Sequence, residues 1–518
     1  MTEGAPRHST VNEILLWAIF LLIACLYLLL IFTDRVPTFG LIILGGLWLL
    51  YVVLTGRQAY VTPLDLPIFA LLSLLPLNLA ISTDWSLTLP KVYGLILGIA
   101  IFYWLVHFVR YYQRLKLAIF GLILSGIATA LLAGLGMDWS TSRFAALSVF
   151  FEPLTNWLPA IPRQISAGIH ANTAGGVLTL FVPLLAGLAW DKGAFYRVYL
   201  AGKKHAKIIH VLYKAVLLAA LLLALLVVTL SDSRGAILGG GVGLFALAVW
   251  KDRRFLWLMP LVIIGLGILF FLAAGGSLYQ LIEMLETSEE STYYGRLTVW
   301  QNTLAVIQDF PLTGVGMGTL GQVFNDFYHY TIFVYNPTNY LHAHNTFLAA
   351  AVDLGLTALV LYASLLTGAG LMIKRRLKIG RSVLKTLLQG LACGLLAFHI
   401  FGLMDAFVLG TKLGAVLWIF LGLVSAVYVH KDGFRWQRSL DAGEQARNII
   451  PKPGCNLLKT HILEILIGLG AWLLLSLVAV SFVNLSPLLS VLLAIAGGVF
   501  LGTFIMKRFR KNNGKLKA

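Results

Sequence analysis

Two apolar runs joined by a short polar turn decide the fold of this chain. Residues 208–250 have the sequence IIHVLYKAVLLAALLLALLVVTLSDSRGAILGGGVGLFALAVW. Each run approaches or exceeds the roughly 18 apolar residues that a helix needs to cross a bilayer. The turn between the runs, around Arg234, is too short to be a domain. We therefore expect two membrane-spanning helices in a tight hairpin, with Arg234 at its mouth.

The rest of the chain repeats this pattern. Hydrophobic residues make up 59%, charged residues only 12%, and the mean hydropathy is +0.86, whereas soluble proteins carry about 25% charged residues. The apolar runs do not alternate as barrel strands do. We predict an all-α polytopic membrane protein with about fourteen transmembrane helices. The expected spans are 13–32, 38–54, 64–81, 90–109, 116–136, 172–190, 208–230, 233–250, 255–275, 345–372, 383–404, 411–430, 461–484 and 486–506.

Positive charge is distributed unevenly between the two sides of these spans. With the N-terminus placed in the cytoplasm, most of the 39 Lys and Arg residues fall on the cytoplasmic side, as the positive-inside rule requires. The outside receives Arg35, Lys91, Arg143, Arg163, Arg234, Arg296 and Lys412. The net charge of +17 therefore belongs to the membrane topology and predicts no nucleic-acid partner. Both termini are expected in the cytoplasm.

This topology divides the chain into four parts. Residues 1–136 form an N-terminal transmembrane frame, and 137–430 form the expected catalytic region, whose large outward loop, 276–344, lies between spans 9 and 10. Residues 431–460 form a cytoplasmic segment. Residues 461–518 supply two C-terminal transmembrane helices and a basic tail. The three cysteines show neither a metal pattern nor a disulfide pattern.

Two outward arginines are candidates for binding an anion. A guanidinium group suits bidentate contact with phosphate, so Arg234 and Arg296 together predict a clamp for a diphosphate. Ser233 and Gly235 flank the first arginine and are included as substrate-binding candidates. The alternatives are an interfacial Arg234 paired with Asp232, and a solvated Arg296.

Histidines at the start of span 10 are candidates for proton transfer. His344 precedes Asn345 where the apolar run resumes, and an imidazole is easily poised near neutral pH. His342 is two residues away, but two ligands without a third are weak evidence for metal, so we predict no metal. The alternative is an interfacial histidine that only forms hydrogen bonds. A weaker candidate, Asp405, is expected to be a solvated loop charge.

A second outward polar cluster lies at the start of span 6. His170 and Asn172 either line the same cavity as His344 or cap that helix. We include both residues as substrate-binding candidates.

The order of these motifs resembles the O-antigen ligase and O-antigen polymerase superfamily. The motifs are Ser-Arg-Gly at 233–235, Gly-Arg with a following Trp at 295, 296 and 300, Pro-Leu-x-Gly-x-Gly-x-Gly at 311–318, and His-Asn-x9-Gly at 344, 345 and 355. The resemblance covers about residues 165–430. It implies a GT-C-like helical fold and a metal-independent glycosyltransferase that needs no cofactor.

The resemblance also implies substrates and a location. The donor would be a glycan on undecaprenyl diphosphate, a polyprenyl carrier, and the acceptor a hydroxyl of lipopolysaccharide core or of another lipid-linked glycan. Arg234 and Arg296 would bind the donor diphosphate, and His344 would position or deprotonate the acceptor hydroxyl, with Asn345 and His342 nearby. The site would face the periplasm or exterior from the bacterial cytoplasmic (inner) membrane. A polysaccharide polymerase of the same superfamily and a lipid-linked sugar transporter or flippase are the alternatives.

Overall fold

The computed structural model describes most of residues 10–136, 171–191, 205–261, 292–328, 342–429 and 470–515, with short gaps inside these ranges. Every regular element in these ranges is helical. The expected all-α class is therefore confirmed for the described part of the chain. The predicted segments at 137–170, 276–291 and 431–460, and His170 with them, lie outside the described residues.

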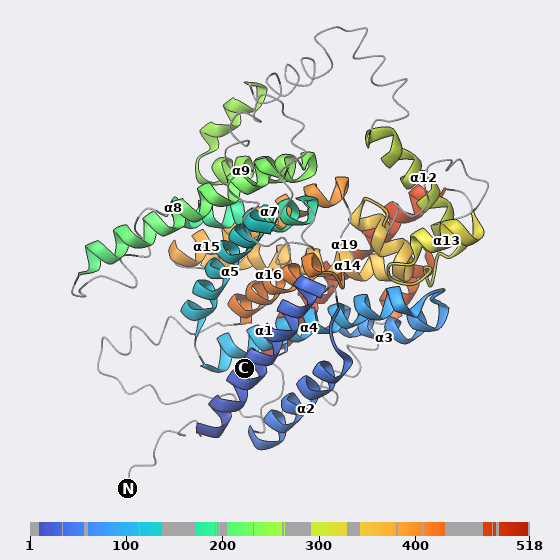
Figure 1. Ribbon diagram of the computed structural model, residues 1–518, viewed down its shortest axis with the longest axis horizontal. Coiled ribbons are helices and arrows are strands. Elements are labelled where there is room, and N and C mark those ends of the chain that lie inside the picture. The colour runs from blue at the N-terminus through green and yellow to red at the C-terminus, as the bar shows by residue number, and fades with distance from the viewer. Residues whose placement is uncertain are drawn as a thin grey trace.

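Most helices coincide with the apolar runs of the sequence. Figure 1 shows how the helices are arranged. The N-terminal group is α1 Thr10–Thr33, α2 Thr38–Thr55, α3 Asp65–Ile81, α4 Trp85–Tyr112 and α5 Leu115–Gly136. The middle group is α7 Ala171–Ala189, α8 Ala206–Leu230, α9 Arg234–Lys251, the 3-10 helix η4 Arg253–Leu258, α12 Thr292–Asp309 and α13 Leu320–Phe327. The last group is α14 Thr346–Ile379, α15 Ser382–Met404, α16 Lys412–Val429 and α19 Pro487–Lys515.

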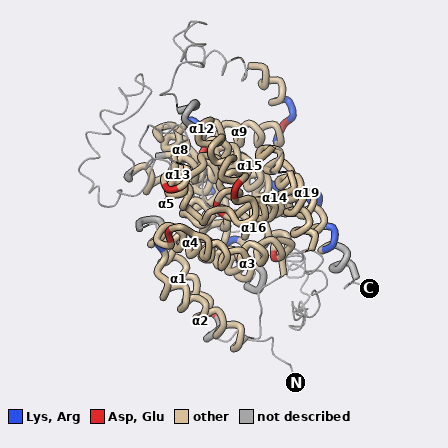
Figure 2. The backbone as a smooth tube through the Cα atoms, turned by 90° about the vertical axis from the view of Figure 1, so that its right-hand side faces the viewer, with Lys and Arg blue, Asp and Glu red and all other residues tan. Residues whose placement is uncertain are grey.

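Within the described residues, nine helices are long and apolar enough to cross a membrane, and α2 and α3 are shorter apolar helices. Most of the expected span 255–275, and the first part of span 461–484, lie outside the described residues. The expected number of about fourteen spans stays a prediction. Figure 2 shows how few charged residues interrupt the described helices.

Helices that are apolar on every face form the centre of the bundle. α14 packs against α19, α15 against α7 and α9, and α16 against α4. Small residues allow close backbone approach at several crossings. For example, a Cβ on Gly94 of α4 would lie 1.9 Å from the carbonyl oxygen of Gly410, and one on Gly498 of α19 would lie 2.4 Å from the Val360 carbonyl oxygen of α14.

The bundle has two chemically different ends. α7, α9 and α14 begin, and α15 ends, at the end that we call the site end. At the opposite end, cationic side chains donate to helix carbonyls. Lys214 Nζ, which the sequence places inside a span, donates to the carbonyl oxygens of Leu188, Ala189 and Asp191 at 3.2, 2.7 and 2.8 Å. Lys214 therefore caps the last turn of α7.

Two consecutive arginines make similar contacts at that opposite end. Arg375 donates to the carbonyl oxygen of Met506 in α19 at 3.1 Å. Arg376 donates to the carbonyl oxygen of Val427 near the end of α16 at 3.0 Å. These bonds tie the last turns of α14 to two neighbouring helices.

Candidate functional site

The α8–α9 hairpin presents Arg234 at the site end. Ser233 is the N-cap of α9, and its hydroxyl accepts a hydrogen bond from the backbone N–H of Ala236 at 3.3 Å. The Ser231 hydroxyl donates to the carbonyl oxygen of Val228 at 2.7 Å. Both serines are buried, whereas Arg234 is exposed. The serine contacts are those of a helix cap, and a role for Ser233 in binding substrate stays a prediction.

Gly235 brings this arginine to the end of α15. A Cβ on Gly235 would lie 3.2 Å from the Cβ of Met404 and 3.3 Å from Cδ2 of Phe401. The missing side chain therefore lets α9 pack closely on α15. Met404 directly precedes Asp405 in the chain, so Arg234 and Asp405 stand on adjoining helix ends.

The first turn of α14 is held by Asn345. Its side-chain oxygen accepts from the backbone N–H groups of Phe347 and Leu348 at 3.0 and 3.2 Å. Its amide nitrogen donates to the carbonyl oxygen of Leu403 at 3.3 Å. Asn345 thus caps α14 and ties it to the end of α15. The sequence predicts a substrate contact for Asn345 and gives no indication of this structural role.

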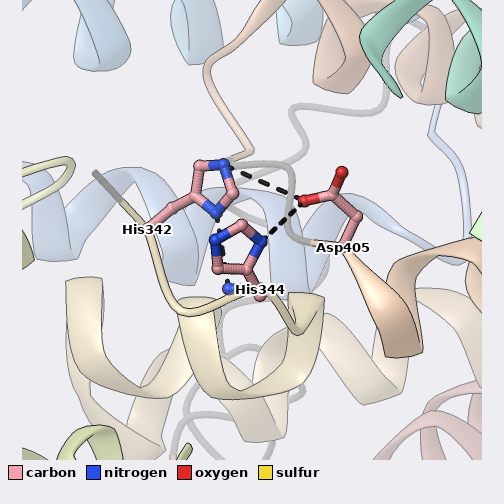
Figure 3. Close-up of side chains that lie close together, drawn as sticks. All are labelled: His342, His344 and Asp405. Atoms are coloured by element: carbon pink, nitrogen blue, oxygen red, sulfur yellow. Dashed lines mark hydrogen bonds and ion pairs between the residues drawn. The ribbon is translucent and has the colours of Figure 1, made fainter. Parts of the chain in front are cut away.

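His344 lies directly before this cap in a left-handed backbone conformation, with φ 46°. Non-glycine residues seldom adopt positive φ, and such strain is concentrated at functional sites. Here it accompanies an arrangement in which the rings of His342 and His344 both turn toward Asp405 (Figure 3). The indole N–H of Trp300 in α12 donates to the carbonyl oxygen of His344 at 3.4 Å.

Asp405 is the centre of this cluster. Its Oδ1 lies 3.2 Å from Nδ1 of His344 and 3.9 Å from Nε2 of His342. Only 7% of Asp405 is exposed. The expectation of a solvated loop charge was therefore wrong: the end of α15 carries this carboxylate against the two imidazoles.

The pKa of Asp405 records the balance of its surroundings. Burial opposes ionisation of the carboxyl. The hydrogen bond from His344, and the nearby charges of both histidines and of Arg296, act in the opposite direction and prevail. The pKa of Asp405 therefore lies below its usual range, and the carboxylate is ionised at neutral pH.

This contact determines which nitrogen of His344 can act as a base. An ionised carboxylate only accepts hydrogen bonds, so Nδ1 of His344 carries the proton that points to Asp405. A neutral imidazole then has its lone pair on Nε2. A carboxylate that orients an imidazole in this way is the arrangement of a general base with its positioning group.

His342, His344 and Asp405 also form the kind of donor set that binds transition metals. Their ligand atoms all lie within 4.8 Å of one another. Nδ1 of His342, however, accepts the backbone N–H of His344 at 3.4 Å, which leaves its proton on Nε2, the nitrogen that faces Asp405. Both ring nitrogens that face the carboxylate therefore carry protons, although only Nδ1 of His344 is within hydrogen-bond distance of it, and the positive Arg296 lies nearby. These proton positions and the nearby positive charge fit a proton-handling cluster better than a cation site.

The two arginines lie on different elements at this end of the bundle. Arg296 of α12 is close enough for its charge to lower the pKa of Asp405, and Arg234 belongs to the adjoining end of α9. Asn172 lies in the first turn of α7, one turn before Gly175. A Cβ on Gly175 would lie 2.8 Å from Oγ of Ser231, so the start of α7 packs against the hairpin.

Three helix N-termini therefore gather at the site end. The partial positive charge of each helix start favours an anion, and the two arginines add to it. Of the residues that the sequence singles out, the structure thus brings Arg234, Arg296, His342, His344, Asn345 and Asn172 to one end of the bundle. Asp405 also belongs to this group of residues, although the sequence alone marks it as a weaker candidate. A signal was available, because Asp405 ends an apolar run on the side where His344 begins the preceding span.

Part of the chain matches a known protein family. Residues 219–363 match the family model described as O-antigen ligase. No curated protein matches the chain. The match extends from within α8 to within α14 and includes Arg234, Arg296, His342 and His344, but ends before Asp405. It confirms the resemblance to the O-antigen ligase and polymerase superfamily, and with the apolar helices it supports a multi-pass membrane enzyme of glycosyltransferase type.

Proposed function

We propose that this protein transfers a glycan from a polyprenyl diphosphate, such as undecaprenyl diphosphate, to a hydroxyl acceptor, in the manner of an O-antigen ligase. The observation that carries the proposal is the contact of His344 with Asp405, 3.2 Å apart, beside the charge of Arg296. The histidine and the arginine both lie within the region matched by the O-antigen ligase model.

His344 acts as the general base in this proposal. Its Nε2 takes the proton of the acceptor hydroxyl while the hydroxyl oxygen attacks the anomeric carbon of the donor. The bond between that carbon and the diphosphate oxygen breaks, and its electron pair leaves with the diphosphate. Asp405 holds Nδ1–H and stabilises the imidazolium that forms. The proton then passes to solvent or to the departing diphosphate.

The arginines stabilise the leaving group. Charge grows on the diphosphate as the glycosyl bond breaks, and Arg234 and Arg296 offer guanidinium donors to its oxygens. Each such donor contributes about 3 kcal/mol to stabilising a transition state. Two arginines and three helix N-termini supply the positive charge that a divalent cation supplies in other diphosphate sites, so the proposed reaction is metal-independent.

The membrane orientation follows from the distribution of positive charge. Most Lys and Arg residues lie in segments assigned to the cytoplasm, which directs the site end toward the periplasm or exterior. The polyprenyl chain then lies in the bilayer with its diphosphate at headgroup depth. The energy for transfer comes from the glycosyl–phosphate bond, so no nucleotide is required on that side.

The proposal is tested with Arg234→Ala and His344→Ala in cells that lack the wild-type chain. We expect surface glycan to disappear in both variants while the protein inserts at wild-type levels. Arg254→Ala, which removes an exposed arginine of η4, is the matched control and should retain full glycan. Normal glycan length and amount in the first two variants would contradict the assignment.

The accumulated intermediate separates the possible reactions. Loss of a ligase leaves long chains on the polyprenyl carrier, whereas loss of a polysaccharide polymerase of the same superfamily leaves single repeat units on the acceptor. Movement of labelled lipid-linked sugar across vesicles without glycosyl transfer would instead indicate a flippase. We expect the first result.

A further inference from the structure

α14, the helix that begins next to His344, is broken within its long apolar span. Gly355 has φ 85° and ψ 167°, which are not helical values. The break leaves a short half-helix, residues 346–354, with His344 directly before its cap, Asn345. The position of this histidine relative to the bundle therefore depends on how the half-helix is held at the break.

The glycine-rich segment 311–318 pairs with the backbone groups that the break exposes. The backbone N–H of Val315 donates to the carbonyl oxygen of Val352 at 2.9 Å. In the reverse direction, the N–H of Leu356 donates to the carbonyl oxygen of Pro311 at 2.8 Å. Unpaired backbone groups are costly in a bilayer, so the segment and the break stabilise each other.

Two glycines make this pairing tight. A Cβ on Gly355 would lie 2.1 Å from the carbonyl oxygen of Leu312, and a Cβ on Gly314 would lie 2.5 Å from the carbonyl oxygen of Val352. Both glycines have positive φ, which other residues rarely adopt. The two backbones therefore interlock with no room for a side chain between them.

Asn78, from α3 of the N-terminal part of the chain, bonds to both members of the interlock. Its amide nitrogen donates to the carbonyl oxygen of Asp353 at 2.7 Å. Its amide oxygen accepts the backbone N–H of Met317 at 3.1 Å. Asn78 is only 1% exposed, and Thr88 of α4 donates to the carbonyl oxygen of Met317 at 3.1 Å. Asn78 and Thr88 belong to the N-terminal frame, which lies outside the matched region. The frame thus forms hydrogen bonds directly to the joint, by which we mean the break in α14 together with segment 311–318.

We infer that Asn78 is a positioning residue for His344, acting through the half-helix 346–354. Asp353 follows His344 by nine positions, a lever of about 14 Å at 1.5 Å per helical residue. A tilt of roughly 5° at the joint therefore moves the imidazole by about 1 Å. A displacement of that size costs about 100-fold in rate when it misplaces a reacting group. The expected loss of rate rests on the proposed function. The expected displacement of His344 does not.

The first test compares Asn78→Leu with Tyr51→Phe in protein reconstituted into lipid nanodiscs. Asn78→Leu removes two buried hydrogen bonds at the joint. Tyr51→Phe is the control because it removes a buried hydrogen bond elsewhere in the N-terminal part, between its hydroxyl and Nε2 of His107 at 2.7 Å. We expect both variants to melt at a lower temperature. Only Asn78→Leu should lower kcat, by about 10- to 100-fold, with the KM for the lipid-linked donor changed by less than about twofold.

The second test reads the position of His344 without any assay of transfer. Histidine side-chain NMR signals, assigned with His344→Gln, should shift for His344 in Asn78→Leu and stay in place in Tyr51→Phe. Thr88→Val, which removes a single bond to the joint, should give a smaller shift in the same direction and serves if Asn78→Leu does not fold.

An inactive wild-type protein with these shifts would overturn the proposed function but keep the positioning role. Unchanged His344 signals, or equal kinetic losses in Asn78→Leu and Tyr51→Phe, would overturn the positioning role.

Discussion

The two ends of the helical bundle use positive charge in opposite ways. At the opposite end, Lys214 donates to three carbonyl oxygens at the end of α7, and Arg376 donates to one near the end of α16. At the site end, Arg234 is exposed, and no hydrogen bond or ion pair joins its side chain to the other described residues. One end uses its cations to complete helices, while the other leaves Arg234 open to an anion.

Helix direction explains the difference. The last turn of a helix exposes carbonyl oxygens, which accept from a nearby Lys or Arg, whereas the first turn exposes N–H groups, which do not. α7, α9 and α14 all begin at the site end. α8 and α15 end there, and side chains other than cations satisfy a carbonyl oxygen in the last turn of each. The Ser231 hydroxyl donates to Val228 of α8, and the amide of Asn345 donates to Leu403 of α15. Local acceptors for a guanidinium are therefore scarce at the site end.

The largest effect is expected from Asp405→Asn, which disrupts the site end without changing its shape. An amide can no longer hold the Nδ1–H tautomer of His344, so kcat should fall by about 100-fold or more. Steady-state transfer from a polyprenyl diphosphate donor measures it. Asp326→Asn, at an exposed position of α13, should keep wild-type kcat. A kcat within twofold of wild type for Asp405→Asn would remove the carboxylate from the mechanism.

Arg234→Lys should have the next largest effect, because it keeps the charge but removes the planar fork. We expect the KM for the donor to rise about tenfold, equivalent to about 1.4 kcal/mol of binding. Arg254→Lys in η4 is the matched exchange and should leave KM unchanged. Equal donor KM values in wild type and Arg234→Lys would show that the charge alone suffices.

Lys214→Met should lower the stability of the fold and leave glycan transfer unchanged. Removal of the ammonium group leaves three carbonyl oxygens without their donor, so we expect a loss of about 1–3 kcal/mol and a lower melting temperature in nanodiscs. The exposed Lys207→Met on the same helix is the control and should melt like wild type. A loss of transfer in fully folded Lys214→Met would contradict the division of roles between the two ends.

The smallest effect concerns acid stability. The pKa of Asp405 is lowered in the folded protein, so its contribution is present above the ordinary carboxyl pKa of about 4 and is lost as pH falls through the lower folded value. We expect the melting temperature of wild type to drop more than that of Asp405→Asn below about pH 4. Parallel pH profiles would show that the histidine contacts contribute nothing to stability.

Much of this organisation is predictable from the chain alone. Apolar runs predict the positions of α1 to α5, α7 to α9, α14 to α16 and α19. Sequence motifs also single out Arg234, Arg296 and His344 as candidate site residues. The helices are predictable because lengths of apolar sequence and sharp polar interruptions are local properties.

Other features depend on contacts between distant segments. Asp405 resembles a loop charge in the sequence, yet it lies against His344, because α15 ends where α14 begins. Asn78 resembles an isolated polar residue in an apolar helix, and its partners are hundreds of positions away along the chain. Neither pairing has a periodicity or spacing that a linear pattern could reveal.

The sequence by itself therefore determined the membrane class, most of the helical segments, the distribution of charge and the candidate site residues Arg234, Arg296 and His344. Tertiary structure decided which carboxylate orients His344 and which cations donate to carbonyl oxygens at helix ends. It also decided how segment 311–318 and Asn78 hold the broken α14. The physical reason is that hydrophobic length acts locally along the chain. Hydrogen-bond partners of buried polar groups are instead selected by the packing of whole helices.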